Sequence, residues 1–98
     1  MSGGTSAPSS ASVSITSSGF SPATLTVGVG GTVTWTNSDS ARHQPATDPH
    51  PTHTGLAGFD AIGGLSQGET FQFTFTRAGT FPYHDHTFPL RQGTVIVQ

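Results

Sequence analysis

The sequence predicts an all-β protein, a two-sheet antiparallel Greek-key β-sandwich, and three observations support this prediction. Short runs alternate apolar with small polar residues, which is the period-two pattern of strands with one buried face. Glycine and proline interrupt those runs where turns are needed. Threonine, valine and phenylalanine dominate the runs, and only 8% of the 98 residues are charged.

The runs are too short and too rich in β-branched residues for helices, and each fits one strand. In chain order they cover residues 13–16, 23–27, 32–37, 69–77, 79–84 and 94–97. In the third run Val33 and Trp35 share one face, opposite a row of threonines. In the fourth run Phe71, Phe73 and Phe75 do the same. We therefore expect Trp35 and the phenylalanine row to lie in the core.

The first twelve residues differ in composition from the rest. Residues 1–12 are small and polar, which predicts a flexible tether, and residues 13–98 form the single domain. Such a leader often follows a removed signal sequence or carries an anchor, although an expression start explains Met1 equally well. The expected location is extracytoplasmic: periplasmic, secreted or attached to a surface through the tether.

Charge and composition exclude several kinds of partner. Lysine is absent, the net charge is −2, and the three cations Arg42, Arg77 and Arg91 are scattered. Nucleic acid is therefore not an expected partner. No apolar run approaches the roughly 18 residues of a membrane span. The chain has no cysteine, so neither a disulfide nor a thiolate ligand is available. We expect a monomer.

All five histidines fall into two groups. Three lie in the long aperiodic segment 38–66 and two flank Asp85 at the end of a strand-like run; they are His43, His50, His53, His84 and His86. Imidazole is a common metal ligand, and loops and strand ends are where sites are usually built. We expect at least three of the five to share one metal ion.

The ligand type narrows the choice of metal. Several neutral imidazoles suit Cu(II), Zn(II) or Ni(II), and the affinity order favours copper, with zinc remaining an alternative. Asp85 lies between two of the histidines and has two possible roles. It orients an imidazole by accepting the proton of the second ring nitrogen, which is the more common arrangement, or it ligates the metal directly.

The strand pattern and histidine positions together resemble the cupredoxin family, which includes plastocyanin, azurin and related bacterial copper proteins. The resemblance covers nearly all of the chain after the tether. It places His43 at the position of the family's first histidine ligand. The segments that carry it are Gly19-Phe20-Ser21-Pro22, Leu25-Thr26-Val27, Gly31-Thr32-Val33-Thr34-Trp35-Thr36-Asn37-Ser38-Asp39, Gly79-Thr80-Phe81-Pro82-Tyr83-His84 and Gly93-Thr94-Val95-Ile96-Val97.

The family's second ligand loop is where this sequence departs. When Gly93 is matched without gaps, Asp85 takes the place of the family's cysteine, Phe88 that of its second histidine and Arg91 that of its methionine. The chain resembles a cysteine-free bacterial branch with Tyr83-His84-Asp85-His86 in that loop. Without a thiolate, an ordinary blue electron-transfer site is not expected.

Strand alternation predicts where a replacement site lies. Asp85 should point inward and His84 and His86 outward, unless a one-residue bulge reverses the faces. The outward pair then meets His50 and His53 from the long loop. His43 either joins them or stays near Asp85.

Three functions compete at this point. The first is a copper-binding module that holds Cu(II) in a cysteine-free, type 2-like site for sequestration, delivery or slow redox, with a copper-handling or redox protein as partner. The second is an enzyme-like type 2 copper site with an open coordination position. The third is a metal-free interaction sandwich. We predict no catalytic residue, because Ser38, Asp39 and His43 have the residue types of a hydrolase triad but no nucleophile elbow surrounds them. We also predict no site for an organic cofactor.

Overall fold

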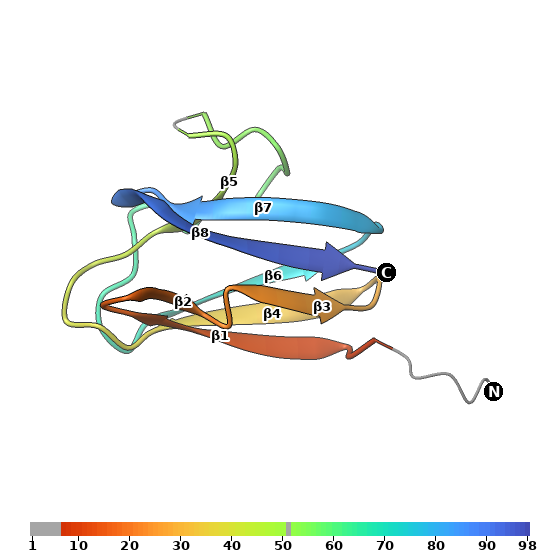
Figure 1. The fold of residues 1–98 in the computed structure, drawn as a ribbon, viewed down its shortest axis with the longest axis horizontal. Coiled ribbons are helices and arrows are strands. Elements are labelled where there is room, and N and C mark those ends of the chain that lie inside the picture. Colours follow the sequence, from red (N-terminus) through yellow and green to blue (C-terminus); the bar gives the residue numbers. More distant parts are fainter. Residues whose placement is uncertain (1–6, 51) are drawn as a thin grey trace.

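The structure is a computed structural model that describes residues 7–50 and 52–98, and it contains two four-stranded sheets packed face to face (Figure 1). One sheet has the strand order β2-β1-β4-β6 and the other β3-β8-β7-β5. The strands are β1 (Ser10–Thr16), β2 (Gly19–Ser21), β3 (Thr24–Val27), β4 (Gly31–Asn37), β5 (Pro45–Thr47), β6 (Thr70–Phe75), β7 (Gly79–Asp85) and β8 (Phe88–Val97). The predicted sandwich is confirmed.

Both sheets are mixed, whereas the sequence led us to expect antiparallel pairing throughout. β1 runs parallel to β4, and β3 runs parallel to β8. The remaining strand pairs are antiparallel. The reason is topological: the chain crosses from one sheet to the other between β2 and β3 and returns at β4. Alternation within a strand reports its two faces and carries no information on its neighbour's direction.

β1 begins at Ser10, three residues before the expected strand, because the backbone of residues 10–12 pairs with that of residues 32–34. Residues 1–6 of the predicted tether lie outside the described residues. Within the described ranges, no helix is long and apolar enough to cross a membrane.

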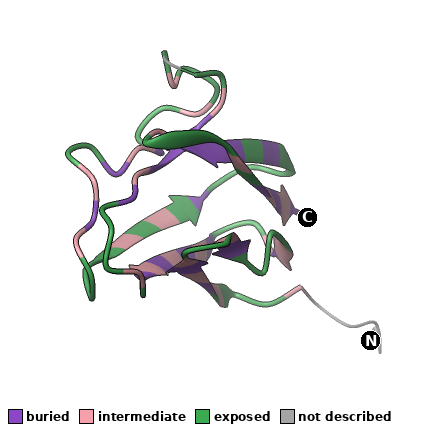
Figure 2. Ribbon diagram, turned by 60° about the vertical axis from the view of Figure 1, so that its left-hand side comes forward, coloured by how far each residue is buried: buried purple, intermediate pink, exposed green. Residues whose placement is uncertain are grey.

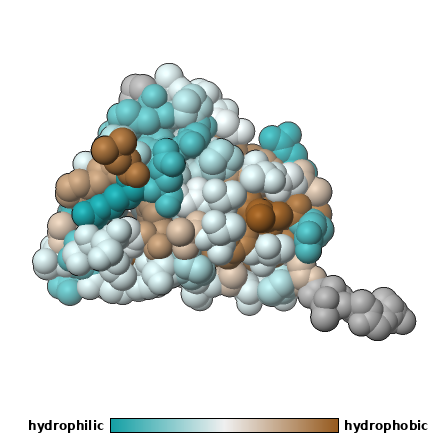
Figure 3. Space-filling model, viewed as in Figure 1, coloured by the Kyte–Doolittle hydropathy of each residue, from teal (hydrophilic) through white to brown (hydrophobic). Residues whose placement is uncertain are grey.

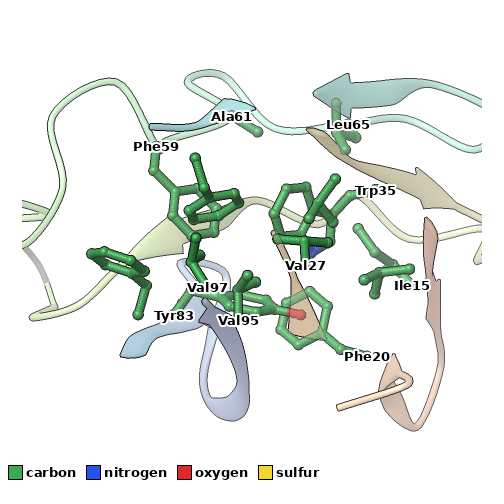
Figure 4. Packing of buried hydrophobic residues seen from close by; sticks show 14 residues of the cluster. Ile15, Phe20, Val27, Trp35, Phe59, Ala61, Leu65, Tyr83, Val95 and Val97 are labelled. Carbon is green, nitrogen blue, oxygen red and sulfur yellow. The ribbon is translucent and has the colours of Figure 1, made fainter. Parts of the chain in front are cut away.

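The core fills the space between the sheets, and buried residues alternate with exposed ones along the strands (Figure 2). Trp35, Phe59 and Tyr83 are fully buried and lie at its centre (Figure 4). The ring centroid of Trp35 is 5.0 Å from that of Phe59 and 5.3 Å from that of Tyr83. Gly93 must lack a side chain, because a Cβ there would collide with the Tyr83 ring.

The predicted core is confirmed for Trp35 and Phe75, while Phe71 and Phe73 are only partly buried. These two residues lie on β6, at the edge of the sheet, where Phe59 stacks against them at centroid distances of 6.2 Å and 5.4 Å. Phe59 comes from the long segment that has no periodicity. A loop residue therefore covers the edge strand and completes the core.

The pairing of β7 with β8 is regular up to His84 and then shifts. His84 pairs with Gln92, whereas Asp85 pairs with Phe88, so the extra residues between them belong to β8. β7 itself continues without an inserted residue. The irregularity therefore leaves the alternation of side chains along β7 intact, and Asp85 faces the opposite side from its two histidine neighbours.

Candidate metal centre

Four histidines from two segments meet beside the outer face of β7. His84 lies near the end of β7 and His86 directly after it, while His50 and His53 lie in the loop that follows β5. β5 pairs with β7, with Ala46 opposite His84, and so brings its loop to that face. In the upper left of Figure 3, where this loop and the β7–β8 turn lie in the view of Figure 1, hydrophilic side chains lie beside a small group of hydrophobic ones.

The ring nitrogens of these four histidines form one compact group. One nitrogen from each ring lies within 4.8 Å of the corresponding atom of every other ring. The Nε2 atoms of His53 and His84 are 3.1 Å apart. The Nδ1 atom of His50 lies 3.2 Å from His84 Nε2, and the Nδ1 atom of His86 lies 3.2 Å from His53 Nε2.

Two of the rings contact a carboxylate through the ring nitrogen that points away from the cluster. His84 Nδ1 lies 2.7 Å from Asp48 Oδ1, and His53 Nδ1 lies 2.8 Å from Asp60 Oδ2. Gln44 Nε2 donates to the other oxygen of Asp60 at 2.8 Å. A neutral imidazole that donates its Nδ1–H to a carboxylate keeps Nε2 as a bare acceptor. Both carboxylates therefore orient a lone pair into the cluster.

This arrangement leaves one contact without a hydrogen when both rings are neutral. The two bare Nε2 atoms of His53 and His84 face each other at 3.1 Å, and neither has a hydrogen to share. Only a cation between them makes the contact favourable. A proton bridges two nitrogens at most, whereas four nitrogens converge here. Metal–nitrogen bonds of about 2.0–2.1 Å place neighbouring ligand nitrogens about 2.9–3.4 Å apart. The three separations of 3.1 Å, 3.2 Å and 3.2 Å given above lie in this range.

The remaining two rings suit the same role. His50 and His86 can carry their proton on Nε2, which leaves Nδ1 as a lone-pair donor. Desolvation lowers the pKa of His50, and His84, His86 and His53 lower it further when they are protonated. His50 therefore stays neutral more readily than an ordinary histidine, and neutral imidazole is the form that binds a metal.

A second group of histidine and aspartate side chains lies on the inner side of β7. His43 is fully buried, with Nδ1 2.5 Å from Asp85 Oδ2 and Nε2 2.8 Å from Asp39 Oδ2. Both ring nitrogens must carry a proton to satisfy both carboxylates. The hydrogen bond from His43 lowers the pKa of Asp39. We call Asp39, His43 and Asp85 the inner triad, and its geometry is that of an imidazolium between two carboxylates.

Asp85 also fixes the segment that carries two of the cluster histidines. Its Oδ1 accepts from Gln44 N at 2.9 Å, from Thr87 N at 3.0 Å and from Thr87 Oγ1 at 2.6 Å. Burial alone would raise the pKa of Asp85, but the hydrogen bonds from Gln44, Thr87 and His43 outweigh it and lower the pKa. The carboxylate therefore remains ionised and binds the end of β7 to the segment before β5.

The expected site residues thus separate into two groups. His50, His53, His84 and His86 come together, while His43 stays beside Asp85, which is the second of the two arrangements that the sequence allowed. Asp85 does not reach the four-histidine cluster as a ligand. Sequence reasoning gave no functional role to Asp48, Asp60 or Gln44. For Asp48, its place two residues before His50 is a usable signal; for Asp60 and Gln44, only the folded loop reveals the contact.

No protein-family model matches this sequence. Amicyanin from Paracoccus denitrificans is 36% identical over 78 residues, which are 76% of this chain and 54% of that protein. The chain thus spans about half the length of this curated relative. A purple cupredoxin from Nitrosopumilus maritimus is 29% identical, with a TM-score of 0.78 over 90% of this chain and 99% of that chain. The structure of the Cu(I) form of an amicyanin mutant is 31% identical, with a TM-score of 0.77 over 94% and 85% of the two chains.

This chain belongs to the cupredoxin family. Two members of its inner triad, His43 and Asp85, lie in contact and take the positions that the resemblance assigns to the first histidine and the cysteine of a blue copper site. Phe88, at the position of the second histidine, packs against His43 with a centroid distance of 5.4 Å. The four-histidine cluster that could hold a metal lies on the other face of β7.

Proposed function

We propose that this protein binds one Cu(II) ion through His50, His53, His84 and His86, in a non-blue site without cysteine. The observation that carries this proposal is the pair of bare Nε2 atoms 3.1 Å apart, each backed by a carboxylate on the opposite ring nitrogen. An all-imidazole site with oriented lone pairs is suited to Cu(II), and zinc is the competing metal.

We assign the inner triad a structural role. His43 has no lone pair to offer while both of its nitrogens donate to carboxylates, and Asp85 is occupied by four hydrogen bonds. Neither residue is included in the proposed ligand set, and Asp85 acts by fixing the end of β7.

The biological role that follows is retention of Cu(II) for sequestration or delivery in an extracytoplasmic compartment. Borderline nitrogen ligands favour Cu(II) over Cu(I), so rapid redox cycling is not part of the proposal. The partner is a copper-handling protein that supplies or accepts the ion.

Copper titration with electron paramagnetic resonance tests this function. The dialysed protein should retain one copper per chain and show nitrogen hyperfine structure from several imidazoles, with the wide copper splitting of a type 2 site. A protein that retains less than about half an ion per chain would instead be a metal-free sandwich. Competition with zinc in the same titration decides between the two metals.

A further inference from the structure

The four imidazoles of the cluster are supported very unequally. His53 and His84 each have a carboxylate on the nitrogen that points away from the cluster. Among the described residues no carboxylate contacts the His86 ring, but the backbone N–H of His86 donates to Gln44 O at 2.8 Å, and its neighbour Asp85 is anchored within the inner triad. Two of the four rings and the main chain of a third are therefore held by groups that belong to the folded scaffold.

His50 differs from the other three. It is the exposed member of the cluster, and its Nδ1 contact with His84 at 3.2 Å is its only side-chain hydrogen bond among the described residues. No backbone hydrogen bond in the described part of the chain holds its main chain either. Replacing or displacing this ring costs the fold little, because nothing behind it depends on its position.

We propose that His50 is the exchangeable ligand of the site and that its position is where copper is handed to an acceptor. This rests on the proposed copper function and specifies how the ion leaves. His53, His84 and His86 form a fixed three-imidazole core that retains the ion while the fourth ligand changes.

The exchange is a ligand substitution with no redox step. The bond between copper and His50 Nδ1 breaks, and His50 keeps its nitrogen lone pair. An incoming donor forms the new bond with its own lone pair, and copper stays divalent throughout. The incoming group enters from solvent, because His50 is the ring exposed to it.

Charge indicates the chemical class of the incoming ligand. The two positive charges of Cu(II) are matched by the carboxylates of Asp48 and Asp60, which contact the core imidazoles directly. The site is therefore neutral with four imidazoles bound. A neutral donor preserves this balance, whereas an anion adds a negative charge next to two carboxylates. We infer that the incoming group is an imidazole, as a histidine of the acceptor would supply.

Alanine variants of single ligands test this assignment in the full chain. His50→Ala should still bind one copper with affinity reduced at most about tenfold, and a chelator should remove the ion at least about tenfold faster. The matched control His53→Ala should lose more than about 100-fold in affinity, because it removes a member of the fixed core. Circular dichroism confirms that both variants fold.

Chemical rescue then identifies the incoming ligand. Added imidazole should restore the wild-type resonance spectrum of copper-loaded His50→Ala, while azide at the same concentration should not. Equal loss of copper in His50→Ala and His53→Ala would overturn the exchangeable role, as would rescue by azide in place of imidazole. Failure of the wild type to bind copper would instead overturn the proposed function itself.

Discussion

The inner triad and the four-histidine cluster lie on opposite faces of β7, and in both of them imidazole rings contact aspartates. Only the cluster has ring nitrogens free to bind a metal. In the inner triad both nitrogens of His43 face carboxylates, so protons satisfy every acceptor. In the cluster each carboxylate takes one nitrogen and leaves the other bare. The balance of donors and acceptors therefore distinguishes a metal site from a structural ion pair, and the number of histidines does not.

The largest expected effect on stability comes from breaking the inner triad. His43→Gln leaves Asp85 buried without its charged partner, which should cost about 3–5 kcal/mol of unfolding free energy. Urea denaturation of the metal-free protein measures this loss. The folded fraction should still bind one copper, since His43 is outside the proposed ligand set. Unchanged stability would show that the triad has no structural role.

His84→Ala tests the four-histidine cluster on the other face of β7, where copper binding should be lost. It removes the ring whose Nε2 contacts both His53 and His50, so the affinity for Cu(II) should fall by more than about 100-fold. Copper titration monitored by resonance measures the change. Retention of wild-type affinity in this variant would mean that copper binds elsewhere.

The carboxylates behind the rings should have intermediate effects. Asp48→Asn and Asp60→Asn each remove the charge that orients an imidazole, and each should weaken Cu(II) binding by about 10–100-fold. Asp39→Asn is the matched control, because Asp39 belongs to the inner triad and its carboxylate contacts His43 and Ser40, with no contact to the cluster among the described residues. If all three substitutions weakened Cu(II) binding equally, the cause would be the net charge of the protein and not the orientation of the imidazoles.

Acid should destabilise the metal-free protein through Asp85. Its pKa is lower in the folded state than the ordinary value of 3.8, so the unfolded chain takes up the proton first as the pH falls. The stability that Asp85 contributes is therefore present above about pH 3.8 and declines as the pH falls toward the folded pKa. Urea denaturation at several acidic pH values should show this slope in the wild type. Asp85→Asn should reduce it, and Glu69→Gln should not.

The smallest expected effect concerns the hydrophobic core between the two sheets. Burial raises the pKa of Tyr83 to about 12, and a contact with Trp35 partly offsets this rise. Among the described residues, the Tyr83 hydroxyl and Trp35 Nε1 are both buried without a well-formed hydrogen bond. Tyr83→Phe removes that unsatisfied hydroxyl and keeps the ring contacts, so it should stabilise the protein by about 1 kcal/mol. Thermal or urea unfolding detects the change. A loss of stability would indicate a hydrogen bond to the hydroxyl.

Much of the arrangement around β7 could be predicted from the sequence. The alternation of Tyr83, His84, Asp85 and His86 assigns each side chain to a face, and the shift in pairing falls in β8, where it does not disturb that assignment. The place of Trp35 in the core follows from the same alternation. These predictions succeed because the period of a strand is a local property.

Other contacts depend on how the long loop folds, and the sequence does not indicate them. Phe59 fills the centre of the core, although from the sequence it could equally close one end of the sandwich. Asp60 reaches back across seven residues to His53, and Gln44 joins the inner triad to the cluster. Such contacts carry no periodic signal, because tertiary packing fixes each of them.

The most direct test of the account is a crystal structure of the copper-loaded protein with anomalous diffraction at the copper edge. We expect one ion about 2.0 Å from a nitrogen of each of His50, His53, His84 and His86. The inner triad should keep its hydrogen bonds. An ion between His43 and Asp85, or no anomalous peak near the outer face of β7, would contradict it.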